Sequence, residues 1–296
     1  MIERRTFLAG AAAMGAGATL ARADDAVLPI KRAVEFEMLP ATMSIGDRIQ
    51  LARDCGFEQV ECPTTPDAAK AAEMKQAAEK SGLRIHSVMN MDHWKYPLSS
   101  ADPAVVERSL AGARTSLENA HFWGADTVLI VPGVVDATNS YEDVYKRSRQ
   151  SVEKLLPLAE KYRVIIGIEE VWNKFLLSPP AMVSYVDGFH SEWLRAYFDV
   201  GNVLLYGYPQ DWIRTLDKRI VKLHIKDFSF RPNANGDRVA KWMPLLEGDI
   251  DWRAVYAALR DIGYVGTASV ELPGGDGAYL KEVNRRFERI LSGNVG

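Results

Sequence analysis

Short apolar runs rich in β-branched residues alternate along the chain with longer stretches in which apolar residues recur at helical spacing. Most of the short runs are bounded by polar or turn-forming residues, as buried strands are. They predict eight strands, at Ala33–Met38, Gln59–Cys62, Arg84–Met89, Thr127–Val131, Val164–Glu170, Ala196–Asp199, Val221–His224 and Thr267–Glu271.

Helical periodicity fills the intervals between these strands. Pro103 and Pro179 suit the first turn of a helix, and several glycines are typical of helix ends: Gly56, Gly82, Gly124 and Gly263. The clearest helical patterns lie at Ile45–Asp54, Ala68–Lys80, Val105–Trp123, Tyr141–Tyr162 and Trp252–Ile262.

Strands that alternate with helices predict parallel βα units, and eight such units close into one (β/α)₈ TIM barrel of the α/β class. We assign this barrel to residues 24–296. The alternative is an open doubly wound sheet, which would carry a glycine-rich phosphate turn after its first strand. The segment Met38–Ala41 at that position has no glycine. The longest predicted loop, Asp227 to Asp249, follows the seventh strand.

Residues 1–23 are typical of a twin-arginine signal peptide. Arg4 and Arg5 precede a weakly apolar stretch rich in Ala and Gly, and Ala21-Arg22-Ala23 fits a cleavage site. A membrane anchor is the alternative, but the stretch from Thr6 to Leu20 is too short to span a bilayer. We therefore expect the twin-arginine export machinery as a partner, cleavage after Ala23 and a periplasmic or otherwise exported protein without a stable membrane anchor.

Composition narrows the class of protein further. The chain is 47% apolar and 25% charged, and its net charge of −3 does not favour nucleic acid or anionic membranes. Cys55 should end a helix and Cys62 should lie near the far end of the next strand. Because these positions would lie at opposite ends of a barrel, we expect two separate buried thiols rather than a disulfide.

Four of the predicted strands end in a residue that can bind a metal: Glu170, Asp199, His224 and Glu271. Each follows an apolar run, and a charge at such a position is costly unless it is compensated. In a barrel these groups would converge at the carboxyl-terminal mouth, where active sites of this fold lie. Three carboxylates and one imidazole could hold Mn²⁺, Mg²⁺, Co²⁺ or Zn²⁺. The alternative is a set of ordinary strand-end residues that face solvent.

The segments around these residues resemble a known superfamily. They are Ile168–Asn173, Phe198–Asn202, Leu223–Asp227, Glu247–Asp251 and Ser269–Glu271, and His93–Leu98 resembles a further His-Arg-Arg-Phe-Pro segment. In this order they resemble the xylose isomerase-like barrels, and most closely the group of L-ribulose-5-phosphate 3-epimerase, hydroxypyruvate isomerase and D-tagatose 3-epimerase.

This resemblance implies that Glu170, Asp199, His224 and Glu271 hold one divalent metal ion, and that Glu170 and Glu271 are the catalytic acid and base. It selects Glu170 over Glu169, which we expect on the other side of the strand. A bound cation can hold the charge of an enediolate, and two carboxylates can remove and return its proton.

The predicted substrate contacts rest on weaker signals. His93 is expected at the sugar because of the resemblance, and Trp94 and Trp172 suit sugar C–H groups as well as they suit core packing. Lys226 could reach the substrate or remain solvated. Glu61 ends the second strand and could contact the substrate, support His86 or form a strand-end salt bridge. The remaining predicted contact is Asn202.

The chain departs from the pattern of the families it resembles at four positions. Leu176 and Asn202 stand where the D-tagatose 3-epimerases have Glu and His, and Trp94 and Lys95 replace two arginines of the phosphate-sugar epimerases. The metal residues are intact, so the departures concern the substrate. Arginine binds phosphate through two parallel hydrogen bonds, and these arginines are absent here. We therefore predict that the substrate is a sugar without phosphate.

These observations predict a metal-dependent sugar isomerase or 3-epimerase. The alternative is a lyase or hydratase that acts on a keto-sugar or keto-glycoside through the same site. A metal-dependent endonuclease would need a basic face and more than the five histidines present. A non-catalytic sugar-binding protein would not require both Glu170 and Glu271. The identity of the sugar and of the metal, and whether the chain forms a homo-oligomer, stay open.

Overall fold

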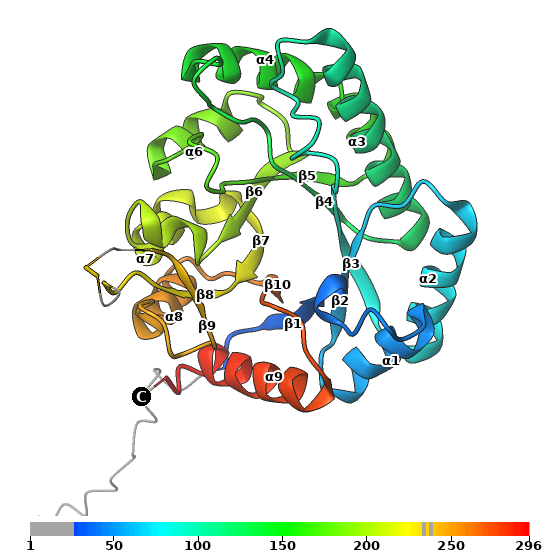
Figure 1. The fold of residues 1–296 in the computed structure, drawn as a ribbon, viewed down its shortest axis with the longest axis vertical. Helices are drawn as coiled ribbons and strands as arrows, with labels where there is room; N and C mark the ends of the chain where they lie inside the picture. Colours follow the sequence, from blue (N-terminus) through cyan, green and yellow to red (C-terminus); the bar gives the residue numbers. More distant parts are fainter. Residues whose placement is uncertain (1–26, 233–234, 237–238, 296) are drawn as a thin grey trace, which may run out of the picture.

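A computed structural model describes residues 27–232, 235–236 and 239–295 of the chain. The predicted signal peptide and its cleavage site therefore lie outside the described residues. In the described part, eight parallel strands close into a barrel in the order β1-β10-β7-β6-β5-β4-β3-β2, and helices surround it (Figure 1). The predicted α/β fold, a single (β/α)₈ barrel, is confirmed.

The barrel strands lie close to the predicted ranges. They are β1 (Ile30–Glu35), β2 (Gln59–Pro63), β3 (Arg84–Met89), β4 (Thr127–Ile130), β5 (Ile165–Glu169), β6 (Leu194–Asp199), β7 (Ile220–Ile225) and β10 (Gly266–Val270). The largest difference is in β1, which begins and ends three residues early; Phe36–Met38 forms a short 3-10 helix instead.

The helices begin at side chains that bond their free amide groups. Ser44 caps α1 (Ile45–Asp54) and Asp102 caps α3 (Pro103–Trp123), each by accepting a hydrogen bond from a first-turn backbone N–H. The other helices are α2 (Ala68–Ser81), α4 (Tyr141–Glu153), α5 (Leu156–Tyr162), α6 (Pro179–Asp187), α7 (Pro209–Leu216), α8 (Trp252–Asp261) and α9 (Gly277–Leu291). All four glycines predicted at helix ends have positive φ, which favours glycine.

One predicted helix is two. The pattern over Tyr141–Tyr162 contains Pro157, which has no N–H to continue the hydrogen-bond ladder and lies in the first turn of α5. The helix is therefore interrupted between Glu153 and Leu156. Cys55 and Cys62 are buried free thiols, as predicted.

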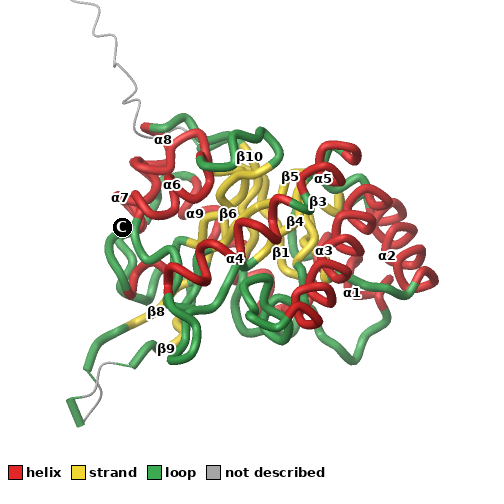
Figure 2. The backbone as a smooth tube through the Cα atoms, turned by 90° about the horizontal axis from the view of Figure 1, so that it is seen from above, coloured by secondary structure: helices red, strands yellow, loops and turns green. Residues whose placement is uncertain are grey.

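The predicted loop after β7 contains a small hairpin, β8 (Asp227–Ser229) paired antiparallel with β9 (Lys241–Met243). Figure 2 shows this hairpin reaching out from the body of the barrel. Among the described residues, no helix is long and apolar enough to cross a membrane.

The barrel interior is unusually polar. TIM barrels fill this space mainly with branched apolar side chains. Here Thr267 Oγ1 donates a hydrogen bond to Gln59 Oε1 at 2.8 Å, and His86 Nε2 lies 2.9 Å from Ser269 Oγ. Lys222 Nζ forms an ion pair of 2.8 Å with Asp126. Apart from Asp126, which is partly exposed, these groups are buried, and together they form a hydrogen-bonded floor beneath the carboxyl-terminal mouth.

Candidate functional site

A cavity of about 230 Å³ opens at the carboxyl ends of the barrel strands. It is lined by Met89, His93, Trp94, Glu169, Val171, Trp172, Asn202, Lys226, Phe228, Trp242 and Glu271. A larger hollow of about 490 Å³ lies beside α6 and β6, around Asp187 and Arg219, which pair with each other. The smaller cavity is the candidate active site because the metal-capable residues converge there.

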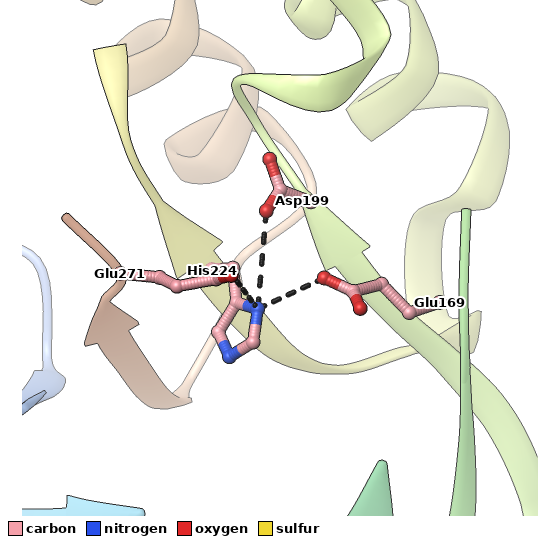
Figure 3. Close-up of side chains that lie close together, drawn as sticks. All are labelled: Glu169, Asp199, His224 and Glu271. Carbon is pink, nitrogen blue, oxygen red and sulfur yellow. Dashed lines mark hydrogen bonds and ion pairs between the residues drawn. The ribbon is translucent and has the colours of Figure 1, made fainter. Parts of the chain in front are cut away.

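Four side chains meet at the base of this cavity (Figure 3). His224 Nδ1 lies 2.9 Å from Glu169 Oε1, 2.8 Å from Glu271 Oε2 and 3.8 Å from Asp199 Oδ2. One ligand atom from each of the four residues lies within 4.8 Å of the others. Strand register explains part of this, because Asp199 of β6 pairs directly with His224 of β7.

The structure corrects the prediction at β5, where Glu169 rather than Glu170 joins the cluster. Ile166 and Ile168 are fully buried in the apolar core. The residues that alternate with them along β5, Ile165, Gly167 and Glu169, therefore face the barrel interior. Gly167 is one of these, since a Cβ there would lie 3.0 Å from the Tyr197 side chain inside the barrel. Glu169 follows the same alternation, and Glu170 therefore points away from the metal-capable cluster.

Glu170 supports the neighbouring strand from that side. Its Oε1 accepts a hydrogen bond of 2.8 Å from the backbone N–H of Asp199. Its other oxygen is buried without a hydrogen-bond partner. Burial, then the charges of Asp199 and Glu169, raise the pKa of Glu170 well above its usual value.

Lys226 supplies a positive charge beside the carboxylates. Its Nζ lies 2.8 Å from Asp199 Oδ2 and 2.8 Å from Glu271 Oε2. Burial alone would raise the pKa of Glu271, but Lys226 and His224 hold that pKa well below its usual range. Burial raises the pKa of Glu169 to about 7, against the opposing effect of His224. The two glutamates thus differ in proton affinity, as an acid and a base do.

The cluster fits a divalent cation. Asp199 Oδ2 and Glu271 Oε2 are buried, and each lies 2.8 Å from the ammonium group of Lys226, so both oxygens face a position where positive charge compensates them. Ligand atoms about 2.1 Å from one ion lie at most about 4.2 Å apart, so the observed cluster would contract only slightly. Three carboxylates and an imidazole form a donor set that several divalent ions accept.

Glu61 lies beneath the cluster and does not line the cavity, in contrast to its prediction as a substrate contact. It is fully buried, and its Oε2 lies 2.8 Å from His224 Nε2. Tyr197 and Ser87 donate hydrogen bonds to the same carboxylate. An interior position on β2 explains the difference, because the side chain points into the barrel below its rim. Glu61 therefore orients His224 so that Nδ1 faces the other three residues.

We expect Glu61→Gln to lower metal affinity about 10- to 100-fold, because a carboxylate bonded to the far nitrogen of a ligand histidine fixes its orientation and raises its basicity. Competition with a chromophoric chelator would measure the affinity. Ser87→Ala is the matched control, since it removes only the 3.2 Å hydrogen bond to Glu61 and leaves the bond to His224. Unchanged affinity in Glu61→Gln would show that Glu61 has no such role.

The other predicted substrate residues do line the cavity: His93, Trp94, Trp172, Asn202 and Lys226. Burial lowers the pKa of His93 to about 4, against the opposing charge of Glu271, so its imidazole is neutral near pH 7. The side-chain amide of Asn202 donates a hydrogen bond through Nδ2 to the backbone carbonyl of Glu170. The backbone carbonyl of Asn202 accepts a hydrogen bond of 2.9 Å from Trp172 Nε1.

Sequence reasoning missed several residues here. Trp242 lies on β9 and Phe228 on β8, in a segment predicted as loop, so their place at the cavity depends on the hairpin. Glu35 ends β1 near the charged residues of the site. Burial, then the negative charges of Glu271 and Glu61, raise the pKa of Glu35 to about 8. The alternation of β1 was the available signal, since Ala33 and Glu35 share a face.

Comparison with known proteins agrees with this arrangement. The model of the family described as xylose isomerase-like TIM barrel matches residues 49–289. The chain belongs to this family. The match covers most of the barrel, including all four residues of the metal-capable cluster.

Relatives of the chain include sugar 3-epimerases. The L-ribulose-5-phosphate 3-epimerase UlaE of Salmonella paratyphi C is 25% identical over 247 residues, which cover 79% of this chain and 84% of that protein. Among solved structures, a D-tagatose 3-epimerase-like protein superposes with a TM-score of 0.75 at 19% identity, covering 90% of this chain and 100% of that one. An L-ribulose 3-epimerase gives a TM-score of 0.74 at 18% identity, covering 90% and 95%.

Proposed function

We propose that the chain is a divalent-metal-dependent sugar isomerase or 3-epimerase that acts on a sugar without phosphate. The observation that carries this proposal is the convergence of Glu169, Asp199, His224 and Glu271 at the base of the cavity. Membership of a family whose relatives include sugar 3-epimerases supports it.

The four residues would hold Mn²⁺, Mg²⁺, Co²⁺ or Zn²⁺, which when bound polarises the ketone and hydroxyl oxygens of a sugar. Glu169 and Glu271 lie at opposite sides of His224 in Figure 3, with their oxygens 2.9 and 2.8 Å from its Nδ1. One carboxylate removes the proton from the carbon beside the ketone, which leaves an enediolate. The other returns a proton.

The position at which the proton returns decides the product. Return to the opposite face of the same carbon gives the epimer, and return to the neighbouring carbon gives the isomer. Asp199 and His224 act as ligands only. Lys226, at 2.8 Å from two of the carboxylates, balances their charge and lines the cavity beside the substrate.

The direct test is deuterium exchange. Metal-loaded protein in D₂O should introduce deuterium beside the ketone of a ketose from a panel and form its epimer or aldose. Loss of water or an alcohol from the product would assign the lyase or hydratase reaction on a keto-sugar or keto-glycoside. No exchange with any free, glycosylated or oxidised sugar would contradict catalysis at this site.

The absence of phosphate from the substrate is a separate prediction. Trp94, one of the two residues that replace the arginines of phosphate-sugar epimerases, lines the cavity and offers an apolar face. The ammonium of its neighbour Lys95 lies 5.3 Å from the Tyr96 ring, and a lysine is only a point charge toward phosphate. We expect kcat/KM for a free ketose to exceed that for the matched ketose phosphate. A tenfold preference for the phosphorylated sugar would overturn this prediction.

We also propose export through the twin-arginine route, on the strength of Arg4, Arg5 and the Ala21-Arg22-Ala23 site. The mature protein should begin at Asp24, which N-terminal sequencing would show. Replacing Arg4 and Arg5 together by Lys should retain the protein in the cytoplasm, because the route reads the arginine pair. Normal export of that double variant would exclude this route.

A further inference from the structure

Three tryptophans remain exposed at the rim of the proposed active site. The exposed fractions are 56% for Trp94, 40% for Trp172 and 44% for Trp242, and all three line the cavity. Tryptophan is usually well buried, so three partly exposed rings around one opening indicate a ligand-binding surface.

The rings on one wall are held in place. Trp172 lies 5.0 Å from Phe228, and Phe228 lies 4.5 Å from Trp242, measured between ring centroids. The indole N–H of Trp172 donates a hydrogen bond to the backbone carbonyl of Asn202. Because Phe228 is only 3% exposed, it supports the two tryptophans from below. Trp94 comes from the loop after β3, where its ring meets that of His93 at 5.4 Å.

The cavity is too small to enclose two sugar rings. Its volume of about 230 Å³ lies below the roughly 300–1,000 Å³ of pockets that enclose drug-sized ligands. Its polar end, with Glu169, Glu271 and Lys226, would take the reacting sugar. Any second ring would have to lie across the rim, where the indole faces are.

The chemistry of the rim favours an uncharged ring. Arg231, which follows the aromatic segment of β8, is paired with Asp249 at 2.9 Å. Lys226 is already held between two carboxylates. Flat aromatic faces exclude water from the C–H face of a pyranose and leave its hydroxyl groups in solvent.

We propose that Trp94, Trp172 and Trp242 form an outer subsite for a second, uncharged sugar ring, so that the preferred substrate is a glycosylated ketose rather than a free monosaccharide. This inference rests on the proposed function for the inner site. The outer ring contributes binding energy away from the reacting carbon.

The test compares D-fructose with two glycosylated ketoses, lactulose and isomaltulose, in D₂O with metal-loaded protein. We expect kcat/KM for at least one disaccharide to exceed that for D-fructose by about tenfold, the scale of one or two aromatic contacts. In a Trp94→Ala/Trp242→Ala double variant this ratio should fall close to one. Phe122→Ala, which removes an exposed aromatic ring on α3 away from the cavity, is the matched control and should keep the wild-type ratio.

Binding separates failure of this inference from failure of the proposed function. Saturation-transfer NMR with lactulose reports which of its two rings contacts the protein, whether or not any proton is exchanged. Contacts from both rings that weaken in the double variant would support the subsite even if no ketose reacts. Contacts from the fructose ring alone, no lactulose binding, or a ratio that the double variant leaves unchanged, would overturn it.

Discussion

Glu169→Gln should lower kcat by about 10²- to 10⁴-fold while the fold survives, because the amide can no longer take or return the substrate proton. Glu169 Oε1 lies 2.9 Å from His224 Nδ1 at the base of the cavity. We expect a loss of the same order for Glu271→Gln. Turnover would be measured with metal content determined on the same sample, since an amide is also a weaker ligand.

Glu170→Gln is the matched control, on the adjacent residue of the same strand. Its carboxyl group is buried, and burial raises its pKa above the usual value, which favours the neutral form that a glutamine resembles. A glutamine has nearly the same shape and can still accept the hydrogen bond from the Asp199 N–H. We therefore expect less than about a tenfold loss. If Glu170→Gln lost turnover with metal bound while Glu169→Gln kept it, the proton would be carried by Glu170.

His224→Ala and Asp199→Ala should each abolish tight metal binding and activity, from about one ion per chain in the native protein. His224 supplies the imidazole of the donor set, and Asp199 supplies a buried carboxylate oxygen. Elemental analysis after dialysis, with activity on the same samples, would measure both effects.

His121→Ala is the control for removal of a histidine as such. His121 stacks on Tyr162 at 4.5 Å on the outside of the barrel, so metal content should not change. Circular dichroism would establish that the His224 and Asp199 variants are folded. Full metal occupancy in both of these variants would contradict the assignment of the cluster.

The alternation of residues along each strand was sufficient to predict that Glu169, rather than Glu170, lies at the site. In β6, β7 and β10, an apolar residue that packs outward directly precedes Asp199, His224 and Glu271: Phe198, Leu223 and Val270. The same rule applied to β5 selects Glu169, which follows Ile168. The resemblance of the segment to relatives shifted the choice by one residue, and a shift of one reverses the face of a strand.

The sequence by itself determined the local structure and the kind of chemistry. Apolar periodicity, proline and glycine positions, and caps such as Ser44 and Asp102 are local features, because each acts within a few residues along the chain. They specified the strands, most helices and the barrel. The recurrence of acidic residues and a histidine after apolar runs specified a metal-capable mouth.

Only the tertiary structure decided which residues meet. Glu61 and His224 are 163 residues apart in the chain, and their 2.8 Å contact exists because β2 and β7 face each other across a closed barrel. The hairpin of β8 and β9 likewise places Trp242 at a cavity whose other two tryptophans, Trp94 and Trp172, come from the loops after β3 and β5. Such contacts depend on barrel closure and on how far each side chain lies below the rim, and no local pattern along the chain encodes that depth.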